Sequence, residues 1–487
     1  MKAPLIGGAY EARSYVADAQ RCVNLYPEVN QQDAPFPTTH YLTPGLVALA
    51  TLAADFPIRG VYTASNGELF VVCGSGLYYV ESTWNATLLG SINPGTDPVS
   101  MVDNNTYLVV VDGTPAGGWT VVLSTHVFAT WSDPNFLGGD TVQFLDTFLV
   151  LNEPGTQNWY HSDSNAITFN ALAIAAKTDY QDLLSTILVN NQRVWAFGTQ
   201  RATELWYNAG GSPFAFAQVP GVMIERACGA IYSPQAMGLA NYWLGIIREG
   251  TRVVFRGEGQ EARRVSNHAL EFALSGYATV SDAVGWTYES LGHFYYVLSF
   301  PSADATWVFD ETTGLWHEWA WADGDGVLHR HRGICHTVAY GVHVVGDHSN
   351  GKIYKLDFET YTDDGDPIIR IRSWPHFIIG FNWQKQAIPA EGKRLIYNSF
   401  MLEMQTGASP DTTPASPPTV SLRWSFDKGK SWGNPIEQSI GATGQYQVRP
   451  TWWRLGLGAD VVFEASWSGA FATGLNGAYV DSTVLGT

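Results

Sequence analysis

Short apolar runs, separated by Asn, Asp or Gly, recur along roughly the first three quarters of the chain. Each unit opens with a short apolar stretch, turns on Asn, Asp or Gly, and continues as a stronger run of β-branched and aromatic residues. Most units add a Gly-containing turn and a last run that ends in an aromatic residue, as at Tyr78, Trp206 and Phe255. Apolar runs bounded by turn residues in this way predict β-strands joined by hairpins.

The units repeat at a nearly constant spacing. Corresponding positions in successive units are 40, 41, 45, 44, 53 and 54 residues apart. Several strands per unit at this period predict a β-propeller of six or seven blades, because one blade cannot bury both of its faces alone. A pair of β-sandwiches is the alternative that the pattern leaves open. The corresponding positions are Val61, Met101, Val142, Ile187, Ile231, Val284 and Val338.

The repeat stops near residue 365, and a different strand pattern follows. A loop rich in Pro, Ser and Thr is expected at 408–419, and after it Val420, Leu422 and Trp424 alternate with Ser421 and Arg423. This alternation predicts a strand with one buried face. We therefore expect three segments: an extended N-terminal arm or ring-closing segment at 1–57, a β-propeller at 58–365, and a C-terminal β-sandwich at 366–487.

Composition supports an all-β fold and restricts the partners. Hydrophobic residues make up 45%, charged residues only 15%, and there are 49 glycines, a mixture that favours strands and tight turns. The formal charge of −18 argues against coating by nucleic acid, which needs clustered Lys and Arg. We expect no membrane anchor, and synthesis and folding in a cytoplasm. The four cysteines, Cys22, Cys73, Cys228 and Cys335, lack a CxxC pair and are expected to be small buried hydrophobes.

One short motif raises the question of sugar chemistry. Residues 425–432, SFDKGKSW, fit the Asp-box pattern of sialidases and many other β-proteins, with Ser425, Asp427, Gly429 and Trp432 at the defining positions. We expect Asp427 to bond back to turn amides, Gly429 to take a positive φ, and Trp432 to tuck under the next strand. A glycan-binding or glycan-cleaving propeller is the alternative function. The motif occurs once and outside the repeats, so we interpret it as a structural hairpin.

No other pattern assembles a reaction centre. His329, His331 and His336 have a loose metal-site spacing, but no acidic or Cys ligand at standard spacing completes the set. No carboxylate pair, nucleophile motif or phosphate-binding loop is distinguished by its spacing. We predict a non-enzyme without catalytic, cofactor-binding or metal site. A basic segment precedes an expected helix with Ser266 as N-cap, and fits either a phosphate-contacting patch or a solvated turn; its arginines are Arg252, Arg256, Arg263 and Arg264.

Several segments resemble a known family. LWYNAGGSPFAFAQVPGVMIERACGAIYSP, ARRVSNHALEFAL, HFYYVLSFPSADATWVFDETTGLWHEW and LRWSFDKGKSWGNPIEQSIGATGQYQVRPTWWRLG occur in this order. They resemble the packaged-DNA stabilisation proteins of short-tailed bacteriophages, which form the tail hub or nozzle. The likeness covers about residues 200 to 460, and the first 60 more loosely. One departure is LGLGADVVFE at 455–464, where a more basic segment is expected.

The resemblance implies a virion protein assembled in the bacterial host cytoplasm. It implies a homo-oligomeric ring, expected to be a hexamer, below the portal and adaptor (head–tail connector) proteins. The ring is expected to close the channel, retain packaged double-stranded DNA, and provide the path for DNA ejection. It is also expected to hold a tail needle, fibres or tailspikes. An acidic lumen would let DNA slide without sequence-specific binding, because phosphate affinity depends on positive charge.

Tryptophans supply the candidate interface residues. The chain has 19 Trp and 23 Tyr, and both residue types are enriched in the cores of protein interfaces. The segments WHEWAWADG at 316–324 and TWWRLG at 451–456 stand out, with Trp316, Trp319, Trp452 and Trp453 as possible contacts to another subunit or tail protein. Burial inside the propeller or sandwich of the same chain is the alternative for each.

Overall fold

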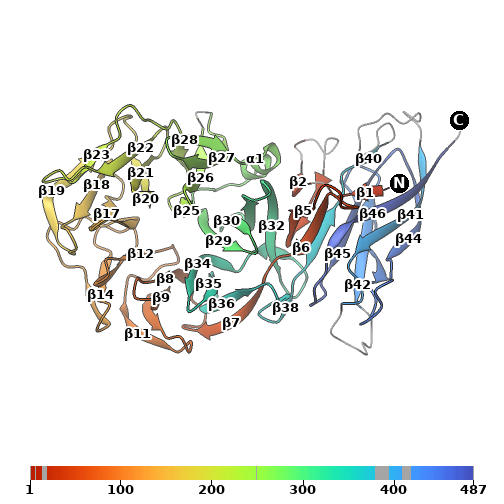
Figure 1. The fold of residues 1–487 in the computed structure, drawn as a ribbon, viewed down its shortest axis with the longest axis horizontal. Helices are drawn as coiled ribbons and strands as arrows, with labels where there is room; N and C mark the ends of the chain where they lie inside the picture. The colour runs from red at the N-terminus through yellow and green to blue at the C-terminus, as the bar shows by residue number, and fades with distance from the viewer. Residues whose placement is uncertain are drawn as a thin grey trace.

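The structure is a computed structural model that describes residues 2–5, 7–11, 13, 19–247, 249–378, 394–408 and 418–485. The predicted all-β class is confirmed, since only 2% of the chain is helical. Small antiparallel sheets surround a central axis, and a second, longer-stranded layer lies to one side (Figure 1). Most of the expected Pro/Ser/Thr-rich loop, 409–417, lies outside the described residues.

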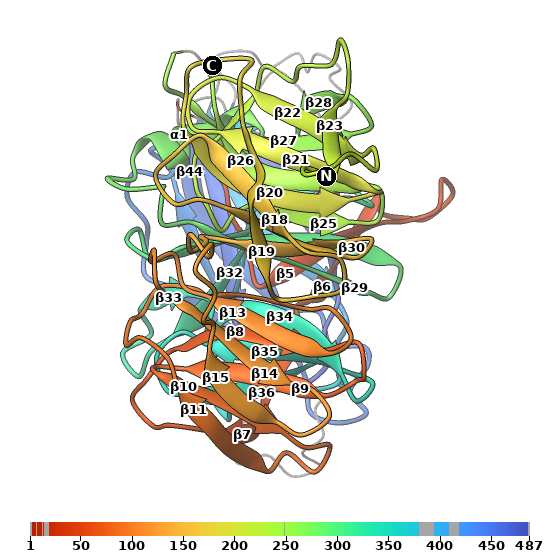
Figure 2. The same cartoon turned by 90° about the vertical axis from the view of Figure 1, so that its left-hand side faces the viewer.

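The first four blades are four-stranded antiparallel sheets built from consecutive strands. Their outermost strands β11, β15, β19 and β23 lie on the side of the molecule that points away from the second layer (Figure 2). The strands of these sheets are β8 (Ile58–Thr63), β9 (Leu69–Cys73), β10 (Gly76–Val80) and β11 (Ala86–Ser91); β12 (Ser100–Asp103), β13 (Tyr107–Val111), β14 (Gly118–Val122) and β15 (Val127–Thr130); β16 (Val142–Leu145), β17 (Phe148–Asn152), β18 (Asn158–Ser162) and β19 (Phe169–Ala176); and β20 (Leu184–Asn190), β21 (Arg193–Gly198), β22 (Thr203–Asn208) and β23 (Phe216–Gln218).

Three further sheets complete the circle of seven within the described residues. The last blade closes with β7 (Gly45–Thr51), a strand from near the N-terminus that pairs with β36 antiparallel. The remaining strands are β24 (Ala227–Cys228), β25 (Gln235–Met237), β26 (Ala240–Ile246), β27 (Arg252–Glu258) and β28 (Glu261–Arg264); β29 (Val284–Ser290), β30 (His293–Phe300), β31 (Ala305–Asp310), β32 (Leu315–Ala322) and β33 (Leu328–Arg330); and β34 (Gly333–Ala339), β35 (Val342–Asp347), β36 (Lys352–Asp357), β37 (Thr362–Asp363) and β38 (Asp366–Pro367).

A hydrophobic cluster fills the space between each pair of neighbouring blades. Phe70 of the first blade and Val110 of the second blade belong to one such cluster. Ile353 of the seventh blade and Val71 of the first blade belong to another. The other contacts around the ring are formed by equivalent clusters. The blades are therefore held by packing of sheet on sheet, which is the main stabilising term for strands this short. Of the corresponding positions in the sequence repeat, only Ile231 lies outside the first strands of the sheets, in the turn before β25.

The second layer is a β-sandwich assembled from both ends of the chain. One sheet has the order β44-β41-β46-β6-β5 with β1 on β46, and the other continues β39-β45-β42-β43. The fold prediction of a propeller with a C-terminal sandwich is confirmed; the ranges 1–57, 58–365 and 366–487 stay predictions, and strands from the first range serve both layers. The strands are β1 (Lys2–Pro4), β5 (Leu25–Val29), β6 (Thr38–Leu42), β39 (Arg370–Ser373), β40 (Phe377–Ile378), β41 (Leu395–Met404), β42 (Thr419–Ser425), β43 (Ile436–Ser439), β44 (Thr451–Gly458), β45 (Asp460–Trp467) and β46 (Leu475–Val484).

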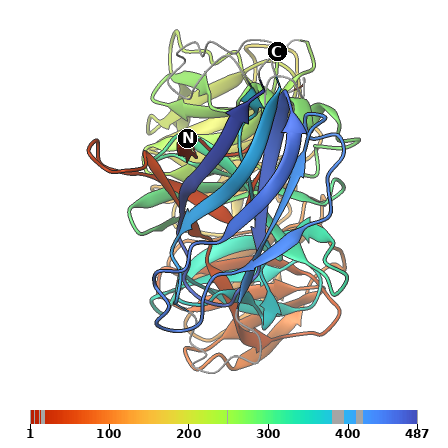
Figure 3. The same cartoon turned by 90° about the vertical axis from the view of Figure 1, so that its right-hand side faces the viewer.

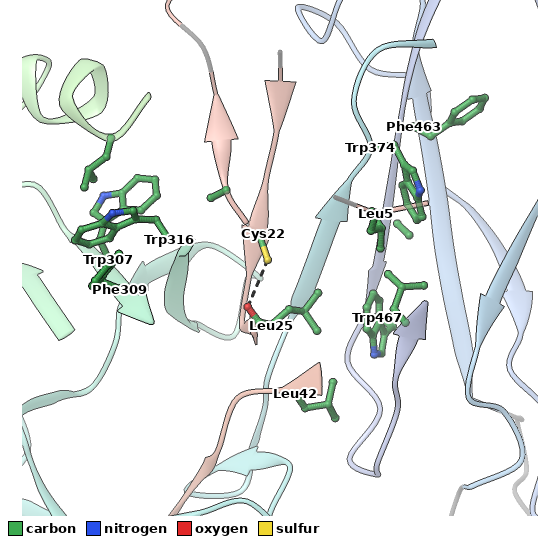
Figure 4. Close-up of a cluster of buried hydrophobic side chains, with 14 of the residues drawn as sticks. Leu5, Cys22, Leu25, Leu42, Trp307, Phe309, Trp316, Trp374, Phe463 and Trp467 are labelled. Atoms are coloured by element: carbon green, nitrogen blue, oxygen red, sulfur yellow. Dashed lines mark hydrogen bonds between the residues drawn. The ribbon is translucent and has the colours of Figure 1, made fainter. Parts of the chain in front are cut away.

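Propeller and sandwich share one core through the N-terminal segment. The segment also forms a small hairpin, β2 (Tyr10–Glu11) with β3 (Ala19–Gln20), followed by β4 (Cys22–Val23). β4 lies between β32 of the sixth blade and β39 of the sandwich. One buried cluster runs from Trp316 through Cys22 and Leu25 to Trp374 and Trp467 (Figure 4). The two layers are therefore not separable along this seam without exposing apolar surface to water.

Candidate functional site

The blades enclose a central cavity of about 680 Å³. Its wall is formed by the inner ends of all seven sheets, so every blade contributes residues to it. Hydroxyl and amide side chains such as Thr141, Thr186 and Gln235 alternate with apolar ones such as Ile187 and Ile334. This wall is chemically mixed and follows from the radial geometry of a propeller.

Arg59 is the most buried charged residue of this wall, with 4% of its surface exposed. Its guanidinium donates hydrogen bonds to the carbonyl oxygens of Asp97 at 2.7 Å, Asn93 at 2.8 Å and Gly74 at 3.0 Å. Burial lowers the pKa of Arg59. These bonds join the loops of the first two blades, so the Arg59 side chain holds the two blades together.

The Asp-box residues form the turn between β42 and β43. The Asp427 carboxylate accepts hydrogen bonds from the Ser431 amide at 2.8 Å and the Ser425 hydroxyl at 2.7 Å. The Gly429 amide donates to Ser425 Oγ at 2.8 Å. Hydrogen bonds from the Ser431 hydroxyl, the Ser431 amide and the Ser425 hydroxyl hold the pKa of Asp427 well below its usual range. Gly429 has φ of +88°, as expected, and Lys428 also has a positive φ, of +69°.

Trp432 was expected to tuck under the next strand, whereas its ring contacts the preceding strand. Its ring is half-buried, and the Arg423 guanidinium of the preceding strand β42 lies 4.7 Å from the ring centre. Arg423 also forms an ion pair with the buried Glu464. All of these contacts lie within the hairpin and the strands that support it, so the motif stabilises this hairpin.

The three histidines of the HRHRGICH segment lie in three separate environments. His329 lies at the surface between Asp304, at 2.7 Å, and Asp323, at 3.3 Å. His331 is buried against Trp319, and burial lowers its pKa to about 4. His336 lies 3.0 Å from His343. Within the described residues, no three His, Cys, Asp or Glu side chains form a group that could hold a metal ion.

Two of the four arginines of the basic segment in the fifth blade, Arg256 and Arg264, are paired with carboxylates. Arg256 contacts Glu258 at 2.6 Å and Glu311 at 2.8 Å, and Arg264 contacts Glu271 at 2.5 Å. Charges paired in this way are less available to phosphate. The expected helix exists as α1 (His268–Ser275).

The N-cap prediction for this helix was wrong by one residue. Asn267 is the cap, and its side chain accepts the Leu270 amide at 2.8 Å. Ser266 instead donates to Glu271 and accepts from the Val254 amide, which ties the helix to β27. Both residue types are good caps, so the sequence alone did not choose between them.

The four candidate interface tryptophans differ in exposure. Trp316, Trp319 and Trp452 are each 2% exposed, whereas Trp453 is 69% exposed. The indole of Trp316 donates to the Val265 carbonyl at 2.9 Å, and that of Trp452 donates to the Ile436 carbonyl at 2.7 Å. The interface role stays a prediction, and of these four only Trp453 has a side chain that is exposed to solvent.

Two buried arginines that sequence reasoning did not single out lie where the propeller meets the sandwich. Arg370 and Arg372, in β39, are fully buried. Arg372 donates to the carbonyls of Gly7 at 2.9 Å and Arg21 at 3.0 Å in the N-terminal segment. Arg370 donates to the carbonyl of Gly469 at 2.9 Å. The signal available in the sequence was a pair of charges at alternating positions inside the otherwise apolar run IIRIRSW.

Asn24 strengthens the same junction from the N-terminal side. Its side-chain amide donates to the carbonyls of Ala320 and Ile369, each at 2.8 Å, and its oxygen accepts the Ala320 amide at 2.9 Å. One residue thus bonds to the sixth blade and to the chain entering the sandwich.

In the described part of the chain, no helix has the length and apolar character needed to cross a membrane.

Solved structures resemble this chain in general architecture at low identity. An extracellular domain from B. thetaiotaomicron aligns at 10% identity and a TM-score of 0.40 over 88% of this chain, which spans 58% of that chain's length. BamB from Moraxella catarrhalis aligns at 12% identity and a TM-score of 0.39, over 69% of this chain and 97% of BamB. A catalytically inactive virginiamycin B lyase from Staphylococcus aureus aligns at 10% identity and a TM-score of 0.44, over 64% of this chain and 98% of the lyase chain. No curated relative matches by sequence.

Seven blades fused through a shared core to a β-sandwich define a propeller–sandwich protein. The sequence matches two family models, the β-propeller of bacteriophage P22 Gp10 over residues 1–361 and its β-sandwich over residues 380–482. The chain therefore belongs to the bacteriophage P22 Gp10 family of phage stabilisation proteins. It is a structural component of a phage virion.

Proposed function

We propose that this chain is the tail hub, or nozzle, that closes the portal channel and retains packaged DNA. The observation that carries the proposal is the family match, which extends over both the propeller and the sandwich. In this proposal several copies, six by our expectation, form a ring below the portal and adaptor proteins. The ring holds a tail needle, fibres or tailspikes and provides the path for DNA ejection.

The charge of the chain supports passage of DNA without binding. Six copies at −18 each would carry about −108 in total. A ring with acidic residues at its lumen repels phosphates, because counterion release on DNA requires Lys and Arg contacts. The pairing of Arg256 and Arg264 with carboxylates adds to this property. The proposed role needs no chemical reaction, so we propose a non-enzymatic protein.

Particles assembled with and without this chain test the proposal. We expect particles that lack it to package DNA and then lose it, which is measured as the fraction of DNA-filled heads by electron microscopy and as nuclease-sensitive DNA. Adding the purified full-length chain to freshly filled heads should restore retention. Particles that keep their DNA equally well without the chain would contradict the proposal.

A further inference from the structure

The connection between the third and fourth blades contains a fully buried lysine. Lys177 follows directly after β19 and has 0% of its surface exposed. Lys352 and Lys355 also form ion pairs with aspartates, but their side chains are 33% and 37% exposed. β19 and β20 face the viewer in Figure 2, whereas Figure 3 looks onto the sandwich from the opposite side, so the connection lies away from the junction. A buried lysine at this place costs free energy unless its amine has a partner.

The partner of Lys177 is the carboxyl group of Asp182. Nζ of Lys177 contacts Oδ1 of Asp182, and the two side chains are 0% and 3% exposed. Among the described residues, no other acceptor contacts this amine. An ammonium group in this position keeps N–H groups without acceptors, and the desolvation of a buried ion pair can exceed the attraction between its charges. Conversion of the pair to a neutral amide would remove both costs.

The second oxygen of Asp182 is held by backbone amides of the turn between β21 and β22. The amides of Gln200 and Arg201 donate hydrogen bonds to Oδ2 of Asp182 at 3.1 Å and 3.0 Å. A Cβ atom at Gly198 would overlap with Oδ2, so glycine leaves room for the carboxyl group. Two amides directed at one carboxyl oxygen stabilise the negative charge that develops there when a nucleophile attacks the carbon. The Asp182 carboxyl group is therefore held as an electrophile.

Glu204 fixes the backbone that follows Lys177. It is fully buried, and its Oε1 accepts hydrogen bonds from the amides of Thr178 at 2.8 Å and Asp179 at 2.7 Å. These bonds hold the turn in which the Lys177 amine and the Asp182 carboxyl group are in contact. Two reacting groups that are already held together need no further loss of freedom to react, which lowers the barrier between them.

We propose that the side chains of Lys177 and Asp182 condense to an isopeptide bond between Nζ and Cγ. One proton passes from Nζ to Oδ1, and the neutral amine then attacks Cγ. The negative charge moves to Oδ2, where the amides of Gln200 and Arg201 stabilise it. The Cγ–Oδ1 bond breaks, and Oδ1 leaves as water with a second proton from Nζ.

The reaction needs no other reactant. An ammonium and a carboxylate have together the composition and charge of one amide and one water molecule, so no oxidant or activated donor is consumed. The product closes residues 177–182 covalently between β19 of the third blade and β20 of the fourth. This modification is independent of the ring in the proposed function.

Mass spectrometry of the purified full-length chain under denaturing conditions tests the proposal. We expect a mass about 18 Da below that calculated from the sequence, which is the loss of one water molecule. Because an acylated lysine is not a trypsin site, the residues on both sides of Lys177 should remain in one peptide, and its fragments should carry the link to Asp182. A succinimide at an aspartate also loses one water molecule but leaves Lys177 cleavable, so that result would overturn the proposal.

Two variants locate the reaction. Lys177→Arg keeps the positive charge but lacks the amine, so its mass should equal the calculated mass. Lys352→Arg changes an exposed pair, with Asp364, and should keep the loss of one water molecule. A wild-type chain of full calculated mass that trypsin cleaves after Lys177 would show an ordinary ion pair and overturn the proposal. A loss of water that persists in Lys177→Arg would also overturn it.

Discussion

The propeller and the sandwich are built on different principles. In the propeller, each sheet comes from consecutive strands, and each contacts its two neighbours through a cluster of its own. In the sandwich, strands from residues 2–42 lie among strands from residues 370–484. The propeller region is strongly acidic, whereas the sandwich region is nearly neutral. Repetition therefore gives the propeller its stability, and the sandwich depends on contacts between the two ends of the chain.

The strongest test of this contrast is the junction between the two parts. Replacing Arg372 with Met should destabilise the protein by about 5 kcal/mol, because several buried acceptors lose their donor at about 1–3 kcal/mol each. We expect the urea unfolding curve to separate into two transitions, with the sandwich unfolding first. Arg263→Met, at an exposed position of β28, should leave the curve unchanged. A single transition at the original midpoint would show that the two parts are not held together by Arg372.

The sandwich core is tested by two neighbouring tryptophans with opposite burial. Trp452→Ala should cost about 3–5 kcal/mol, because it leaves a cavity beside Phe400 and removes the hydrogen bond to Ile436. Trp453→Ala should change stability by less than about 0.5 kcal/mol, since its side chain is exposed. Both are measured as shifts in the urea midpoint of the isolated chain. Equal effects of the two changes would contradict the assigned burial.

The closure of the propeller is tested by an equivalent pair in β7. Leu46 is 1% exposed and packs between the sixth and seventh blades, whereas Val47 is 37% exposed. Leu46→Ala should cost about 2–4 kcal/mol and Val47→Ala much less. Hydrogen exchange should show lost protection in β7 and β36 for Leu46→Ala alone. Loss confined to the sandwich would mean that β7 does not hold the ring.

A buried acid near the junction gives a pH-dependent test. Asp363 is 3% exposed, and burial raises its pKa to about 7 although Arg332 and Arg370 act to lower it. Between about pH 4 and pH 7 the folded protein keeps a proton that the unfolded chain has lost. The stabilising contribution is therefore complete below about pH 4 and is lost progressively as the pH rises to about 7.

Asp363→Asn removes this dependence. Relative to the wild type, the unfolding free energy of the variant should rise from pH 5 to pH 8 by on the order of 2 kcal/mol. Urea titrations at both pH values measure it. Asp325→Asn, at an exposed turn, serves as control and should show no such change. A difference that stays constant between pH 5 and pH 8 would show that Asp363 is ionised in the folded protein.

The smallest effect is expected at the Asp-box turn. Asp427→Ala removes the acceptor for Ser431 and Ser425, so amides of residues 425–432 should exchange faster. Because the pKa of Asp427 is held low, its contribution is present above its ordinary pKa and is lost as the pH falls. The global midpoint should stay nearly constant, as for Glu437→Ala in β43. A midpoint shift as large as that of Trp452→Ala would mean that the turn supports the whole sandwich.

The propeller could be predicted from the sequence because its signal is repeated. Val61, Met101 and Val142 each mark the first strand of a blade, so an error in one unit is corrected by the others. The Asp-box turn was also predictable, because its bonds join residues only a few positions apart.

The junction and the exposure of Trp453 could not be predicted in the same way. Arg372 bonds to Gly7 and Arg21 over more than 350 residues of sequence, and no local pattern announces such a partner. For WW at 452–453, alternation requires one inward and one outward side chain, but the sequence does not say which. Only the pairing of Trp452 with Phe400 in the folded sheet decides it.

The pairing of β7 with β36 also constrains how the protein is made. β7 ends at Thr51 and β36 begins at Lys352, so the ribosome completes the first strand long before the second exists. At about 5–20 residues per second, the intervening chain takes roughly 15–60 s to translate. Until Lys352 and the residues after it are made, β7 lacks the strand of the seventh blade with which it pairs, and the nascent ring stays open. Closure of the propeller is therefore one of the last events of synthesis, and a truncated chain that stops before Lys352 cannot form it.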